Sequence, residues 1–320
     1  MIIIIICLAL IGIYMAFIVA PAVLSYIKVF GSRMPDEYGD IYCSKYHMGV
    51  HSEKIERGQD FFRGKERRII EITTDDSIML RGDYYDCKSD KTVIFLHGYN
   101  SNRYDNMVMQ GRLFYDLGFN ILFTCQRGHG ISGGKASSLG IKEQYDVMEW
   151  IKYVSAMSKN KEILIYGMSM GAVAVCYASD KIKDKSVKAI ISDCGFISPY
   201  RQLLYDCKLR HLPGKLLVPW ERLIARIFVG YDIKVPTTDS LRKTKIPILF
   251  IHGTEDRTVP VMCCREAYLM CSSEKEILCV ENADHTMAFA DGGRYIENKV
   301  TDYVKKYFSL NEKNGMMQNE

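Results

Sequence analysis

Short apolar runs alternate with longer amphipathic segments along most of the chain. The apolar runs cover residues 93–96, 121–123, 163–166, 247–251 and 276–280. Runs of this length without a polar face are typical of strands buried on both sides, as in parallel sheets. Two segments show helical spacing: residues 139–157, through Ile141, Tyr145, Met148, Ile151 and Val154, and the last segment, through Ile296, Val300, Tyr303 and Tyr307. The pattern predicts an α/β fold with helices on both faces of the sheet.

The N-terminal segment has a different pattern, because residues 1–27 contain no charged side chain. A helix of that length covers about 40 Å, which is enough to cross a hydrocarbon layer of about 30 Å. We therefore expect a transmembrane anchor over residues 1–27. A cleavable signal peptide is the alternative, since Ala20-Pro21-Ala22 resembles a cleavage site, but a basic start is missing and the apolar run is long.

The charges and the cysteines indicate the side of the membrane on which the rest of the chain is expected. Lys28, Arg33 and Lys45 follow the apolar segment, so the positive-inside rule places the following domain in the cytoplasm. The eleven cysteines are odd in number and form no C-x-x-C pair, which favours buried thiols in a reducing compartment over disulfides or a metal site. Residues 28–65 mix both charge signs and are interpreted as a juxtamembrane linker. Residues 66–310 are expected to form one domain and residues 311–320 a flexible tail.

A glycine-flanked serine follows the apolar run 163–166. The sequence there is Gly167-Met168-Ser169-Met170-Gly171, and the small apolar residues 172–178 come next. Glycines two positions on either side let a serine occupy the sharp strand-to-helix turn called a nucleophile elbow. Ser169 is therefore the candidate nucleophile.

A serine hydroxyl needs a histidine base and a carboxylate that orients the histidine. Asp256 lies in the loop after the strand predicted at 247–253, and His285 lies in the loop after the strand at 276–280. The order serine, aspartate, histidine, each after a strand, is that of α/β-hydrolases. Glu255 and Asp284 are the nearest alternatives to Asp256. The remaining histidines, His252 among them at a strand end before glycine, are rejected as the base because only His285 follows the final strand.

Acyl transfer also needs two backbone N–H groups that bind the developing oxyanion. The residue after the nucleophile, Met170, is expected to supply one of them. The loop after the third strand, His97-Gly98-Tyr99, is expected to supply the other from Tyr99.

Gly128, Gly130 and Gly133 also spell the dinucleotide fingerprint G-x-G-x-x-G. In a Rossmann unit the third glycine opens a helix and an acidic residue ends the next strand, and neither condition is met here. We expect no cofactor, no metal and no nucleic-acid partner.

Residues 198–244 do not show the alternation of strand and helix patterns seen in the rest of the domain. Trp220, Leu223, Ile224, Ile227 and Phe228 form an apolar helical stripe, which favours a lid over the serine, with an ordinary packing helix as the alternative. Trp220, Ile224 and Phe228 are the expected substrate contacts of this lid. The segment carries nine basic and four acidic residues, a balance that suits anionic membranes or acyl substrates, although a solvated basic face is the commoner meaning of such a run.

The chain resembles α/β-hydrolases of the serine aminopeptidase-like and prolyl-oligopeptidase-like branch, in particular bacterial hydrolases behind one N-terminal membrane segment. The similarity covers residues 66–308 and rests on these segments: His97-Gly98-Tyr99, Arg127-Gly128-His129-Gly130, the elbow around Ser169, Ser192-Asp193-Cys194-Gly195, His252-Gly253-Thr254-Glu255-Asp256, and His285. It departs at Gln126, where such families usually carry an aspartate that supports the loop.

The resemblance implies a mostly parallel eight-stranded sheet with a small helical lid. It implies a serine hydrolase that cleaves an ester, thioester or amide of a small, lipid-like or peptide substrate through an acyl-serine intermediate. Related membrane-tethered hydrolases are often regarded as facing outward, which leaves the side of the membrane open. The alternative function is a catalytically silent hydrolase-like module that acts through interactions at the membrane.

Overall fold

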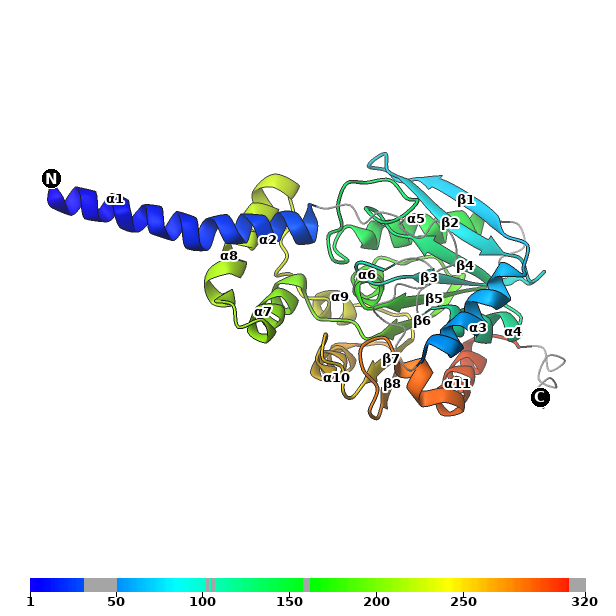
Figure 1. Cartoon of the computed structure of the whole chain (residues 1–320). Coiled ribbons are helices and arrows are strands. Elements are labelled where there is room, and N and C mark those ends of the chain that lie inside the picture. The colour runs from blue at the N-terminus through cyan, green and yellow to red at the C-terminus, as the bar shows by residue number, and fades with distance from the viewer. Residues whose placement is uncertain (32–50, 102–103, 105–106, 158–161, 311–320) are drawn as a thin grey trace.

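The computed structural model of the chain describes residues 1–31, 51–101, 104, 107–157 and 162–310. The expected tail at 311–320 and most of the expected linker lie outside these residues. The N-terminal segment forms one continuous helix from α1 (Ile2–Tyr14) through the π-helical turn η1 (Met15–Val19) to α2 (Ala20–Phe30). Figure 1 shows α1 projecting away from the rest of the protein, whereas α2 lies against the rest of the protein near α8 (Gly214–Ile224).

The domain is built on one eight-stranded sheet, as expected. Its strand order is β1-β2-β4-β3-β5-β6-β7-β8. The strand β2 runs antiparallel to both β1 and β4, and the other pairings are parallel. The strands are β1 (Arg68–Thr73), β2 (Met79–Tyr85), β3 (Lys91–Leu96), β4 (Asn120–Cys125), β5 (Glu162–Met168), β6 (Val187–Asp193), β7 (Ile248–Gly253) and β8 (Lys275–Val280).

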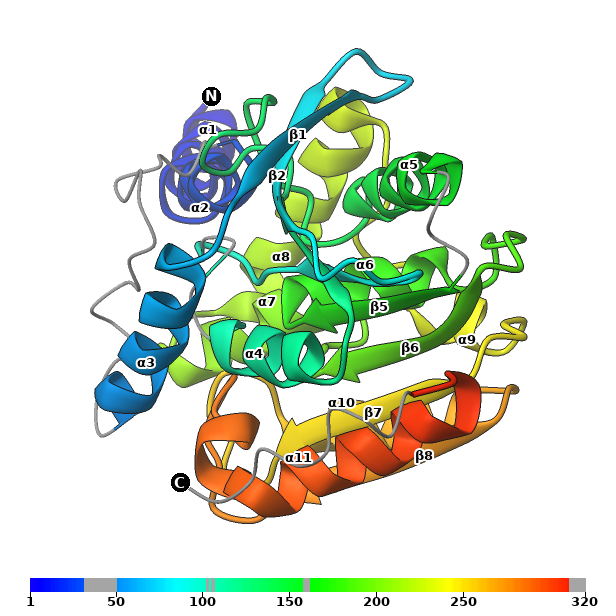
Figure 2. The ribbon, with the colours of Figure 1, turned by 90° about the vertical axis from the view of Figure 1, so that its right-hand side faces the viewer.

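Helices cover both faces of this sheet, as Figure 2 shows. One face packs against α3 (Ser52–Arg63), α4 (Val108–Asp116) and α11 (Ala288–Tyr307). The other packs against α5 (Glu143–Ala156), α6 (Met170–Ala178) and α10 (Val261–Met270). The segment between β6 and β7 carries α7 (Pro199–Leu209), α8 (Gly214–Ile224), the π-helical turn η4 (Ala225–Val229) and α9 (Thr238–Leu241).

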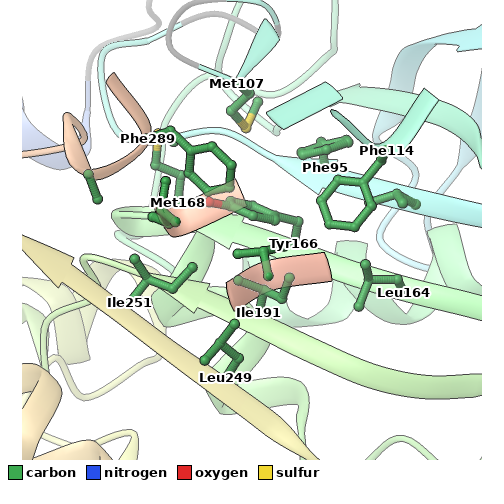
Figure 3. Packing of buried hydrophobic residues seen from close by; sticks show 14 of the residues in the cluster. Phe95, Met107, Phe114, Leu164, Tyr166, Met168, Ile191, Leu249, Ile251 and Phe289 are labelled. Carbon is green, nitrogen blue, oxygen red and sulfur yellow. The ribbon is translucent and has the colours of Figure 1, made fainter. Parts of the chain in front are cut away.

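The core on the first face is rich in aromatic side chains. Figure 3 shows Tyr166 of β5 among Phe95, Phe114 and Phe289, and its ring centre lies 5.2 Å from that of Phe95. All four are almost fully buried. Large rings at the centre of a parallel sheet supply much of the apolar area that is removed from water on folding.

A third apolar cluster joins the N-terminal helix to the domain. Tyr26 and Phe30 of α2 are buried with Met170 of α6, Val218 of α8 and Ala225 of η4. The C-terminal part of the N-terminal helix is therefore a packing partner of the domain, and the first part is not, since α1 has no buried residue.

Two segments differ from the sequence-based expectation. Within the expected linker 28–65, residues 52–63 form α3, and its Ile55 and Phe62 are buried in the first core cluster. The helix expected from residue 139 begins at Glu143, because Leu139 and Gly140 have φ angles of 52° and 98°, in the left-handed region that a right-handed helix does not use.

Candidate active site

Ser169 lies on the sharp turn between β5 and α6. Its backbone has φ 52° and ψ −115°, a strained conformation for a residue with a side chain. A Cβ atom on Gly167 would collide with the backbone of Gly171, and one on Gly171 would collide with the carbonyl of Leu96. Both glycines are required by this close approach, and the turn presents the Ser169 hydroxyl at the carboxyl end of the sheet.

The structure brings the three predicted residues of the triad together in one hydrogen-bonded chain. His285 Nε2 lies 3.0 Å from Ser169 Oγ, and His285 Nδ1 lies 2.7 Å from Asp256 Oδ2. Asp256 follows β7 and His285 follows β8, so two adjacent parallel strands place them at the same edge. The neighbouring acids lie apart from this chain: Glu255 is exposed, and Asp284 accepts the backbone N–H groups of Arg257 and His285.

The Asp256 carboxylate is fully buried and has four hydrogen-bond contacts. Its Oδ1 accepts the backbone N–H groups of Thr258 and Val259 at 2.9 and 2.7 Å. Its Oδ2 faces both His285 and His252. Although burial by itself would raise it, the pKa of Asp256 is lowered to about 2 by the hydrogen bonds from His252 and His285. The carboxylate is therefore ionised and able to stabilise a positive charge on His285.

Sequence reasoning rejected His252 as the base because it lies at a strand end, and the structure places it against the Asp256 carboxylate. The fully buried His252 Nε2 lies 3.1 Å from Asp256 Oδ2 and 2.8 Å from the Val259 carbonyl oxygen. Burial disfavours the charged imidazole, but the hydrogen bond to Asp256 and its charge raise the pKa of His252 above its usual value. The only sign of this contact in the sequence is that His252 lies four residues before Asp256.

Asp193 is a second buried group near the triad that sequence reasoning did not single out as a site residue. Its Oδ2 accepts a hydrogen bond from the Tyr166 hydroxyl at 2.5 Å, and its backbone carbonyl accepts the N–H of Ser169 at 2.8 Å. Burial raises the pKa of Asp193 to about 6, although the Tyr166 hydrogen bond opposes the rise. Asp193 thus holds the elbow through its backbone, and its side chain adds a titratable group behind the triad.

The loop after β3 lies beside the nucleophile, as expected for an oxyanion site. A Cβ atom on Gly98 would lie 3.2 Å from the Ser169 Cβ, so the backbone of this loop borders the serine. Met170 is the first residue of α6. The Tyr99 hydroxyl donates to the carbonyl oxygen of Lys28 on α2 at 3.3 Å, which ties the loop to the N-terminal helix.

Gln126, the departure from the family pattern, also contacts this loop. Its side-chain amide donates to the carbonyl oxygen of His97, and its backbone N–H donates to His97 Nε2 at 3.0 Å. The glutamine therefore links β4 to the loop that carries Tyr99.

The three residues expected to line the lid lie in different surroundings. Ile224 packs against the cluster that contains Met170. Trp220 instead donates its indole N–H to the hydroxyl of Tyr14 at 2.8 Å, and Phe228 is 78% exposed. On the inner side of the segment, Gln202 of α7 donates to the carbonyl of Thr258 at 2.8 Å, close to Asp256.

One group of potential metal ligands lies in the site. Cys194, Asp256 and His285 hold ligand atoms within 4.8 Å of one another. Burial raises the pKa of the Cys194 thiol well above its usual value, so the thiol stays protonated, whereas a metal binds the thiolate. Asp256 and His285 already bond to each other, and the group fits a proton relay better than a metal site.

Comparison with known proteins agrees with this fold. Residues 88–237 match the family model of serine aminopeptidase, S33. The chain is 30% identical to the uncharacterised protein YqkD of Bacillus subtilis over 67% of this chain and 70% of that protein. It is 23% identical to the lysophosphatidylserine lipase ABHD12 of Danio rerio, over 59% of this chain and 49% of that protein.

Among solved structures, the Pyrococcus furiosus esterase Pf2001 is similar with a TM-score of 0.63 and 25% identity, over 84% of this chain and 99% of that one. The fold agrees with that of this esterase. The chain belongs to the α/β-hydrolase family, in its serine aminopeptidase S33-like branch.

Proposed function

We propose that the protein is a membrane-anchored serine hydrolase that cleaves an ester, thioester or amide through an acyl-Ser169 intermediate. The observation that carries the proposal is the continuous chain from Ser169 Oγ through His285 to the buried Asp256 carboxylate, with contacts of 3.0 and 2.7 Å. These contacts are the ones that a general base and its orienting carboxylate need.

The reaction follows from these positions. His285 Nε2 takes the proton from Ser169 as its oxygen attacks the acyl carbon, and Asp256 stabilises the resulting imidazolium. The backbone N–H groups of Tyr99 and Met170 bind the oxyanion, and His285 then gives its proton to the leaving group. Water, deprotonated by His285, releases the acyl group from Ser169.

The substrate that we propose is a carboxylic ester with an apolar acyl group. The esterase Pf2001 and the lysophosphatidylserine lipase ABHD12 are similar proteins whose names state ester or lipid hydrolysis. Partly buried apolar side chains at the edge of the cluster around Met170, Ile224 among them, would favour acyl chains over polar side chains. Residues 198–244 act as the lid of this surface.

The membrane anchor is the apolar part of the helix Ile2–Phe30. Its mean hydropathy reaches 3.2 over a window in which no residue is buried, and the helix is 29 residues long. Such a helix is long enough to cross a bilayer. With Lys28 after it, the positive-inside rule favours a cytoplasmic catalytic domain.

A fluorophosphonate probe tests the catalytic proposal, because it labels only an activated serine. The purified full chain in detergent should be labelled, and labelling should vanish in Ser169→Ala. Ser192→Ala is the matched control, since Ser192 is a buried serine on the adjacent strand β6, and it should keep the label. An unlabelled parent chain with a folded circular dichroism spectrum would favour the silent interaction module.

A further inference from the structure

The helix formed by α8 and η4 has two faces with different surroundings. Leu217, Val218 and Ala225 face inward and are buried against the domain. A second apolar stripe, Leu216, Trp220, Leu223 and Ile227, follows helical spacing on another face. Leu216, Leu223 and Ile227 are between 44% and 64% exposed. A contiguous row of apolar side chains exposed to water is unfavourable, and such rows usually mark a surface that contacts another molecule.

The position of the stripe indicates what the partner is. Trp220, in the middle of the stripe, contacts Tyr14 with ring centres 6.2 Å apart and an indole-to-hydroxyl hydrogen bond of 2.8 Å. Tyr14 ends α1, the part of the N-terminal helix without buried residues. The face of α8 that carries the exposed stripe therefore borders the segment proposed to cross the bilayer. Figure 1 shows α8 beside the N-terminal helix at the base of α1.

The depth of this contact agrees with an interfacial helix. A span of about 20 residues that starts at Ile2 reaches the hydrocarbon boundary near Pro21. Tyr14 lies seven residues earlier, which places it about 10 Å below that boundary. Interfacial helices bury their apolar face about 5–10 Å into the boundary between headgroups and acyl chains. The Trp220–Tyr14 hydrogen bond pairs two polar atoms that would find little water at that depth.

Basic residues flank the stripe as they do in helices that lie on anionic membranes. Lys215 and Arg226 are exposed and occupy the neighbouring helical row, one position before Leu216 and Ile227. Lys28, exposed on α2, adds a third positive charge near the predicted boundary. Positive charges at this level attract the headgroups of anionic phospholipids.

We infer that α8 and η4 lie in the surface of a bilayer that contains anionic phospholipid, with Leu216, Trp220, Leu223 and Ile227 inserted among the acyl chains. The inference rests on the proposed membrane anchor and extends it to the lid. The lid then has two sides: its inner side packs toward Met170, and its outer side contacts lipid. A lipid-like substrate can pass from the bilayer to the serine along the lid without crossing bulk water.

The two tryptophans provide the experiment. Trp150 is 1% exposed within the core, whereas Trp220 is on the stripe. The full chain is reconstituted in vesicles of equal parts phosphatidylcholine and phosphatidylglycerol, with or without bromine atoms on the acyl chains. Bromine quenches nearby tryptophan emission. The Trp150→Phe chain, which emits only from Trp220, should lose most of its emission when the bromines lie about midway along the acyl chains. The Trp220→Phe chain, which emits only from Trp150, should keep its emission.

Trp150→Phe changes a buried core residue and can disturb the fold. A second pair of variants therefore keeps Trp150 in place. In the Trp220→Phe chain, Ile227→Trp places a reporter on the stripe and Tyr295→Trp places one on α11, where Tyr295 is 57% exposed. Trp150 emits in both chains, so the quantity compared is the fraction of emission lost between plain and brominated vesicles. Ile227→Trp should lose the share of emission that the new tryptophan adds, and Tyr295→Trp should lose none. An equal fractional loss in the two chains would overturn the inference.

Carbonate extraction separates failure of the inference from failure of the anchor. If the chain resists extraction and the Ile227→Trp reporter is not quenched, the anchor stands and the lid does not touch the bilayer. If carbonate releases the chain, the anchor itself is wrong, and the inference is overturned with it. Quenching that is equally strong in vesicles of phosphatidylcholine alone would overturn the part of the inference that concerns anionic lipid.

Discussion

His252 Nε2 lies 3.1 Å from Asp256 Oδ2, the same oxygen that accepts the hydrogen bond of His285. Asp256 is therefore held on both sides, and its orientation toward His285 depends on a residue that does not touch the serine. We expect His252→Leu to lower kcat about tenfold or more with little change in KM, because a hydrogen bond to a charged group contributes about 1.5–3 kcal/mol. Steady-state kinetics on a short-chain p-nitrophenyl ester measures this.

The matched variant is His252→Gln, whose side-chain amide can donate to the same carboxylate oxygen. It should recover part of the lost kcat, whereas a purely structural role of His252 would make both variants unstable without separating kcat from KM. Equal kcat values for the leucine and glutamine variants, both folded, would rule out the hydrogen bond as the cause.

Asp256 should make the stability of the fold depend on pH in the acid range. Its pKa is lowered from 3.8 to about 2, so the ionised carboxylate stabilises the folded state above about pH 4, and this contribution is lost as the pH falls toward 2. The contribution is about 2 kcal/mol. Urea unfolding of the detergent-solubilised chain at pH 5, 4 and 3 measures it. Asp256→Asn should lack this part of the pH dependence and lower kcat about 10⁴-fold through the wrong tautomer of His285.

Ser169→Ala should abolish turnover while the fold is kept. Loss of a triad nucleophile costs about a factor of 10⁶ in kcat, and alanine fits the tight turn between β5 and α6. The test compares hydrolysis of p-nitrophenyl butyrate and the melting temperature of the two proteins. A variant that kept more than about a tenth of the parent activity would show that another residue is the nucleophile.

Removal of α1 alone should leave the stability of the domain to urea nearly unchanged, whereas removal of α2 as well should lower it. A chain that begins at Ala20 keeps Tyr26 and Phe30 in the cluster with Met170, whereas a chain that begins at Tyr46 loses both. Each of these side chains contributes about 1.5–3 kcal/mol by burial. We expect both truncated chains to hydrolyse short esters, and the chain from Tyr46 to unfold at lower urea concentration. Identical urea midpoints would mean that α2 does not stabilise the domain.

The inner and outer sides of the lid should respond differently to substitution. Ile224 packs toward Met170, whereas Phe228 is 78% exposed. Ile224→Ala should raise KM for dodecanoyl esters more than for acetyl esters, because apolar contacts with the acyl chain form equally in the ground and transition states. Phe228→Ala should leave KM for soluble esters of both lengths unchanged. A parallel loss for acetyl and dodecanoyl esters in Ile224→Ala would place the acyl pocket elsewhere.

The sheet and the three residues Ser169, Asp256 and His285 could be predicted because their signals are local. Each lies a few residues after a continuous apolar run, and parallel strands bring the following loops to one edge. The glycines around Ser169 mark the elbow for the same reason, since both are required by contacts within the motif and with the adjacent strand β3.

Features that depend on contacts far apart in the sequence could not be predicted in this way. The hydrogen bond between Trp220 and Tyr14 joins residues more than 200 positions apart, so an apolar stripe alone does not say which side faces the serine. The helix α3 has a polar sequence, and the burial of Ile55 and Phe62 depends on α4 and the sheet. The role of His252 depends on the carboxylate that the turn after β7 brings back to it.

In the proposed membrane-anchored protein, the uninterrupted helix from Ile2 to Phe30 would couple the orientation of the domain to the thickness of the lipid layer. A span that is longer than the local hydrocarbon thickness adjusts by tilting. Because Tyr99 is bonded to Lys28 and no flexible joint separates α1 from α2, the domain must rotate with the span. In the proposed membrane-anchored protein, a thicker or thinner bilayer would thus raise or lower the loop that carries Tyr99 relative to the lipid headgroups, and hydrophobic mismatch would change the distance of Ser169 from the bilayer surface.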